Sequence, residues 1–222
     1  MKKRTLLSWS SGKDSAWALH ILRQDPEVEL VGLFTTINQA FDRVAMHGVR
    51  AELLRAQAEA AGLPLDIIAL PWPCDHADYA RLMADYVGDC KTRGISHMAF
   101  GDLYLDSVRA YREENLAGSG IAPLFPLWGQ STRELPHTML AAGLKARITC
   151  LDGRKLPAAL AGSRYDAQLL AALPADCDPC AENGEFHTFA WDGPMFRHPV
   201  AHRVGDTVER DGYLFTDLLP AC

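Results

Sequence analysis

Over the first 130 residues, apolar segments rich in β-branched side chains alternate with segments whose apolar positions recur at helical spacing. This alternation is typical of a parallel sheet that is covered by helices on both faces. We expect five strands, at residues 5–9, 28–36, 65–70, 97–101 and 121–127. The pattern therefore predicts an α/β fold with a doubly wound, mostly parallel five-stranded sheet of Rossmann-like type.

Helices are expected between these strands. Residues 49–61 place Leu53, Leu54 and Ala58 on one face, and Gly62 follows as a helix stop. A long helix is expected at 76–93. After about residue 140, the pattern predicts one more strand at 144–151 and a short helix at 165–173.

This change of pattern predicts two units, a larger domain over residues 1–140 and a smaller C-terminal α+β lobe over 141–222. A cleft between the two units would bring Glu182 and Glu185 opposite the loop that follows the first strand.

That loop joins the first expected strand to the first expected helix and consists of small and polar residues. Backbone N–H groups in such a loop can converge on an anion, and the following helix directs its positive dipole end to the same place. Lys13 can neutralise phosphate oxygens, and Asp14 can hold a magnesium ion. We therefore expect a nucleotide site in the loop, which reads Ser10-Ser11-Gly12-Lys13-Asp14-Ser15.

Neither of the two commonest nucleotide motifs explains this loop. The Walker pattern needs a glycine where Leu7 stands and a Ser or Thr where Asp14 stands, and no G-x-G-x-x-G pattern occurs. The alternative to a nucleotide site is a polar turn whose side chains only cap the following helix. The loop resembles the S-G-G-x-D-S pyrophosphate loop (PP-loop) of the N-type ATP pyrophosphatases. It departs at Ser11, where a glycine is usual, so we expect a negative φ at Ser11 unless the backbone there is strained.

Other polar residues follow the expected strands. In doubly wound sheets, ligands bind beyond the carboxyl ends of the strands. Thr35 and His47 belong to the end of the second strand and its loop, and Gly101 and Asp102 to the end of the fourth. We expect these four residues to contact the nucleotide.

Helical spacing places Arg109, Arg112 and Glu113 on one face of the segment 103–115. A surface ladder of ion pairs is one interpretation. The other is that the arginines bind phosphate or a substrate carboxylate, because the guanidinium fork suits planar oxyanions.

Further motifs resemble the diphthine–ammonia ligase family. Residues 182–189 resemble that family's E-G-G-E-(Y/F)-E-T signature and depart from it at Asn183 and His187. The resemblance runs in order from about residue 5 to about residue 200. The other matching positions are Gly101-Asp102, Asp106, Arg109, Arg112, Glu114-Asn115 and Pro126-Leu127-Trp128.

The resemblance implies a HUP-type fold with an ATP-binding PP-loop domain over 1–140 and a substrate-binding lobe over 141–222. It implies that ATP and Mg²⁺ are used to adenylate an acceptor carboxylate, which ammonia then converts into an amide. Lys13, Asp14, Glu182 and Glu185 would be catalytic, with either glutamate binding ammonium and taking its proton. The substrate would contact Arg109, Arg112, Glu114, Trp128 and His187.

Composition restricts the partners. The chain has 222 residues, 48% of them hydrophobic, and a formal net charge of −6, which argues against a broad nucleic-acid surface. No apolar run approaches the ~18 residues of a membrane span. We expect a cytoplasmic enzyme, with a homodimer as a possible assembly, whose acceptor is a protein side chain or a small carboxylate.

Two cysteines leave alternatives open. Cys177 and Cys180 with His198 and His202 superficially resemble a Cys2His2 zinc site, but Pro199 disfavours a helical turn between the histidines. Relatives that thiolate tRNA use cysteine pairs with the same type of loop, so a sulfur-carrying role is the sharper rival. A third interpretation is that the two cysteines only shape the substrate pocket. A further alternative for the whole protein is a sensor that binds ATP without turnover.

Overall fold

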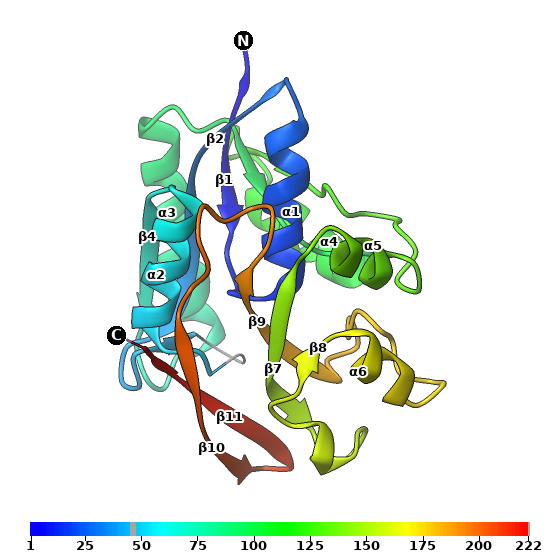
Figure 1. Ribbon diagram of the computed structural model, residues 1–222. Helices are drawn as coiled ribbons and strands as arrows, with labels where there is room; N and C mark the ends of the chain where they lie inside the picture. The colour runs from blue at the N-terminus through cyan, green and yellow to red at the C-terminus, as the bar shows by residue number, and fades with distance from the viewer. Residues whose placement is uncertain (45–47, 222) are drawn as a thin grey trace.

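A computed structural model describes residues 1–44 and 48–221 and shows a mixed α/β protein (Figure 1). Its N-terminal sheet has five parallel strands in the spatial order β4-β2-β1-β5-β6. A short strand β3 pairs antiparallel with the end of β2, so the described residues form a sheet of six strands rather than the expected five. The strands are β1 (Lys3–Ser8), β2 (Val28–Asn38), β3 (Arg43–Val44), β4 (Leu65–Leu70), β5 (His97–Ala99) and β6 (Ala122–Leu124).

Helices cover both faces of this sheet. Buried residues of α1 (Lys13–Gln24) and α2 (Ala51–Ala61) belong to one apolar cluster, and those of α3 (His76–Thr92) and α4 (Asp106–Leu116) to a second. This division follows from right-handed crossovers that run in opposite directions from β1. Helix α5 (Leu135–Ala141) follows β6. Among the described residues, no helix has both the length and the apolar character needed to cross a membrane.

The C-terminal region forms a second sheet whose five strands all pair antiparallel. The expected strand at 144–151 corresponds to β7, and the expected helix at 165–173 to α6 (Ala167–Ala172). The sequence prediction lacked β8, β9, β10 and β11. The strands are β7 (Lys145–Asp152), β8 (Arg164–Tyr165), β9 (Phe186–Asp192), β10 (His202–Arg210) and β11 (Tyr213–Pro220).

The hairpin of β10 and β11 turns at Asp211-Gly212, whose φ angles are 51° and 81°. Two positive φ values match the right-handed twist of the flanking strands, and Asp-Gly is a preferred pair for such turns. This dipeptide was the local signal from which the hairpin could have been predicted.

The two sheets share one apolar core, which runs from Leu7 and Trp9 in the first strand and its loop to Ile148 and Phe189 in the second sheet. In Figure 1, β9 passes beside the N-terminal end of α1. The core therefore sets the second sheet against the loop that precedes α1. The division into two domains at residues 140 and 141 stays a prediction.

Candidate functional site

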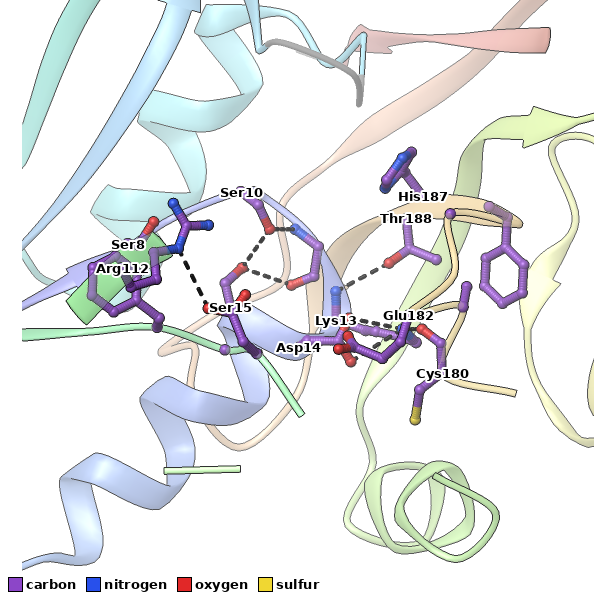
Figure 2. Close-up of a pocket in the computed structure, with 17 residues that line it drawn as sticks. Ser8, Ser10, Lys13, Asp14, Ser15, Arg112, Cys180, Glu182, His187 and Thr188 are labelled. Atoms are coloured by element: carbon purple, nitrogen blue, oxygen red, sulfur yellow. Dashed lines mark hydrogen bonds and ion pairs between the residues drawn. The ribbon is translucent and has the colours of Figure 1, made fainter. Parts of the chain in front are cut away.

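A cavity of about 290 Å³ lies at the carboxyl ends of β1 and β5, and we call it the loop cavity. One wall is the turn from β1 into α1, lined by Ser10, Gly12, Lys13, Asp14 and Ser15. The facing wall comes from β9 and the segment before it, as Figure 2 shows. The expected phosphate loop therefore faces residues that are about 170 positions later in the chain.

Internal hydrogen bonds shape the loop. The Gly12 amide donates to Ser10 Oγ over 3.3 Å, and Ser15 Oγ donates to the Gly12 carbonyl over 3.0 Å. The hydroxyls of Ser10 and Ser15 are 3.1 Å apart. Because both hydroxyls have partners within the loop, its shape is set before any ligand arrives.

The φ of Ser11 is 71°, so the expected negative φ does not occur and the strained alternative applies. A left-handed conformation costs a non-glycine residue roughly 1–2 kcal/mol. Ser11 is fully buried, and its Oγ has no hydrogen-bond partner among the described residues. The turn into α1 thus imposes a left-handed conformation that glycine would adopt without strain, although a serine occupies this position.

Lys13 and Asp14 form an ion pair of 2.8 Å at the inner end of the loop cavity. The Lys13 side chain is only 2% exposed, and its Nζ also donates to the Cys180 carbonyl. Burial alone would lower the pKa of Lys13, but the adjacent Asp14 carboxylate raises that pKa above its ordinary value. Lys13 therefore stays charged inside the protein.

The two glutamates of the C-terminal motif have different environments. Glu182 lines the loop cavity and accepts a hydrogen bond of 3.1 Å from the Leu103 amide. Burial raises the pKa of Glu182 to about 7, and the Asp14 carboxylate adds to the rise. Glu185 is buried outside the cavity lining, where it accepts a hydrogen bond from the Asp178 amide over 3.2 Å. Glu182 is thus the glutamate that faces the loop.

Gly101 and Asp102 lie where β5 ends beside the first turn of α1. A Cβ on Gly101 would come within 3.1 Å of the Asp14 carbonyl carbon and the Ser15 nitrogen, so a larger residue would push the backbone of α1 back by a few tenths of an ångström. Asp102 lines the loop cavity and pairs with Arg112 over 3.4 Å. Both residues help to form the cavity, as does Arg112.

The two arginines of α4 diverge. Arg112 lines the loop cavity, with its guanidinium 4.8 Å from the centre of the Phe100 ring. Arg109 lies outside the cavity lining, 4.9 Å from the ring centre of Trp128, and pairs with Glu113 over 2.8 Å. The ion-pair ladder therefore describes Arg109, whereas the ligand-facing interpretation fits Arg112.

Of the other expected ligand residues, Thr35, Glu114 and Trp128 lie outside the loop cavity. Thr35 is buried in β2 outside the loop cavity. Glu114 lines a second, mostly apolar cavity of about 260 Å³ between α3 and α4, which shares Phe100 and Arg112 with the first. His47 lies outside the described residues.

His187, which stands at a position where the chain departs from the signature, lines the loop cavity. Burial lowers the pKa of His187 to about 4, and the Lys13 ammonium contributes to the decrease. His187 is therefore neutral at pH 7 and brings no positive charge to a phosphate.

Cys180 lines the cavity and Cys177 is half-buried nearby. Burial raises the pKa of both thiols to about 12, so neither is a ready nucleophile at pH 7. Within the described part of the chain, no three His, Cys, Asp or Glu side chains form a group that could hold a metal ion.

The sequence prediction missed several cavity residues. Thr188 lies within the C-terminal signature, and its Oγ1 accepts a hydrogen bond of 3.0 Å from the Lys13 amide. Phe186 places its ring centre 5.7 Å from Lys13 Nζ. Their position within the signature was the available signal, since their contacts with the loop join residues far apart in sequence.

Comparison with known proteins gives one family. A model described as the diphthamide synthase N-terminal domain matches residues 2–121, which is just over half of the chain. No curated protein sequence matches the chain significantly.

Proposed function

This chain belongs to the diphthamide synthase family, and we propose that it is an ATP-dependent ligase that converts an acceptor carboxylate into an amide. The observation that carries the proposal is that the PP-loop and Glu182 line one cavity. A phosphate site and a carboxylate base are the two elements that adenylation followed by ammonia transfer requires.

The first step is attack of an acceptor carboxylate oxygen on the α-phosphorus of ATP. The bond from that phosphorus to the bridging oxygen breaks, and pyrophosphate leaves while an acyl-adenylate forms. The negative charge on the phosphates needs neutralisation more than the step needs a protein nucleophile. The Lys13 ammonium, the dipole end of α1 and Arg112 provide positive charge around the loop cavity.

Magnesium suits the donors of this site. Mg²⁺ in nucleotide sites is held by one or two carboxylates together with phosphate oxygens and water. Asp14 would hold the ion, and Asp102 and Glu182 are the further carboxylates that line the cavity. The bound ion would contribute further charge neutralisation at the phosphates.

The second step is attack of ammonia on the acyl carbon, which breaks the bond to AMP. In its ionised form, Glu182 binds ammonium and takes one proton, so that a nitrogen lone pair becomes available. The nitrogen loses a second proton to solvent as AMP leaves and the amide forms. Its pKa of about 7 matches a group that must both accept and release a proton near neutral pH. The acceptor would be contacted from the same cavity by the neutral His187 and by the charged Arg112.

The test is an incubation with ATP, Mg²⁺, ¹⁵N-ammonium and an extract of the source cells, in which AMP and the label are followed. We expect AMP together with ¹⁵N in a protein or small-molecule fraction. Asp14→Ala should abolish both signals, and the surface variant Glu113→Gln should preserve both. AMP without label would indicate another nucleophile, such as the sulfur of a thiolating enzyme. ATP binding without AMP would indicate a sensor.

A further inference from the structure

Gln57 is a fully buried amide on the otherwise apolar inner face of α2. Its buried neighbours on this helix include Leu53, Leu54 and Ala58. A buried polar group without partners costs about 1–3 kcal/mol, so its hydrogen bonds are expected to show why a glutamine occupies this position.

The Gln57 side chain joins three segments of the chain. Its Oε1 accepts a hydrogen bond of 2.9 Å from Trp9 Nε1. Its Nε2 donates to the Ser11 carbonyl over 2.9 Å and to the Ala190 carbonyl over 2.6 Å. Helix α2, the loop after β1 and strand β9 are therefore connected through one amide.

These bonds fix the strained part of the loop. The Ser11 carbonyl also accepts from the Ala190 amide over 2.9 Å, so two donors hold the peptide group between Ser11 and Gly12. That orientation accompanies the φ of 71° at Ser11. Without the donors, a serine would relax toward negative φ and turn this peptide.

We infer that Gln57 is a positioning residue for the phosphate loop, because its amide sets the orientation of the Ser11–Gly12 peptide. The ligand part of this inference rests on the proposed function. A loop held in this way should bind the β- and γ-phosphates of ATP, so the effect of Gln57 should be specific to ligands that carry them.

The experiment compares Gln57→Met with Leu22→Ala, a buried change at the far end of α1. Calorimetry measures the affinities for MgATP and for AMP, and thermal unfolding measures stability. We expect Gln57→Met to weaken MgATP binding about tenfold or more and to change AMP binding less than about twofold. Leu22→Ala should leave both affinities unchanged. If Gln57→Met leaves the ratio of MgATP affinity to AMP affinity unchanged, the inference is overturned.

Hydrogen exchange separates this inference from the proposed function. We expect the Gly12 and Lys13 amides to exchange about tenfold faster or more in Gln57→Met than in Leu22→Ala. Unchanged exchange would overturn the inference whether or not the wild type binds ATP. Failure of the wild type to bind ATP would refute the proposed function instead. If Gln57→Met does not fold, Trp9→Phe removes one bond to the Gln57 amide. It should lower the ratio of MgATP to AMP affinity several-fold, and an unchanged ratio in a folded variant would contradict the inference.

Discussion

The phosphate loop and helix α4 both carry positively charged motifs, but their surroundings differ. Lys13 is buried, and its backbone and side chain contact residues of the second sheet and the segment before it. Helix α4 buries only Leu116, and Arg109 pairs with Glu113 one turn away at a surface where its side chain is 39% exposed. Long-range contacts therefore hold Lys13 at the cavity. Helical spacing in α4, by contrast, does not by itself bring the charge of Arg109 into the cavity.

The strongest test of this comparison is Asp14→Ala. Loss of the carboxylate that pairs with Lys13 should reduce AMP formation about 10³-fold, because the phosphate site depends on this pair. Glu113→Ala removes the carboxylate of the Arg109 pair and should change the rate less than about twofold. The measurement is AMP release with saturating ATP, and similar losses in both variants would remove the distinction.

Glu182→Gln tests the carboxylate that faces the loop. In the wild type, amide formation should rise with pH through about 7, since the ionised form of Glu182 increases there. The variant should lose about 10²-fold in rate and this inflection, measured as ¹⁵N incorporation between pH 5.5 and 8.5. The free energy of unfolding of the variant should also depend less on pH than that of the wild type. A raised carboxyl pKa makes the wild type less stable as pH rises from about 4.5 to 7, and glutamine removes this slope. An unchanged pH–rate profile would exclude Glu182 as the base.

The two arginines of α4 sharpen the comparison within one helix. Arg112→Ala should weaken ATP or acceptor binding about tenfold, because Arg112 lines the loop cavity and pairs with Asp102. Arg109→Ala should have an effect below about threefold, since Arg109 contacts Trp128 and Glu113 outside it. The Michaelis constants of the two variants provide the measurement. A larger effect at Arg109 would reverse the assignment.

The smallest expected effect is a gain in stability. Ser11→Gly should raise the free energy of unfolding by about 1 kcal/mol, because glycine adopts a φ of 71° without strain. Ser11→Ala is the control, since it removes the buried hydroxyl but retains the strain. Chemical denaturation of both variants provides the measurement. Equal stability of the two variants would mean that φ strain contributes little.

Local pattern predicted the parallel strands well, because each is a short apolar run between a turn and a helix of regular period. The same pattern placed the loop of residues 10–15 at a strand end. It predicted β7 in the second sheet but missed β10, whose side chains are mostly exposed and whose apolar period is weak. The Asp211-Gly212 pair was the remaining local signal there.

The sequence by itself therefore determined the five parallel strands and the helices between them, the PP-loop and the family. Only the tertiary structure decided that Glu182 faces the loop while Glu185 is buried behind it, and that Ser11 adopts a positive φ. In both cases the deciding contacts come from residues that are distant in the chain. Glu182 accepts a hydrogen bond from the Leu103 amide, 79 residues away. The loop is held by bonds from Gln57 and Ala190, which are 46 and 179 residues from Ser11, and local periodicity contains no information about such distant partners.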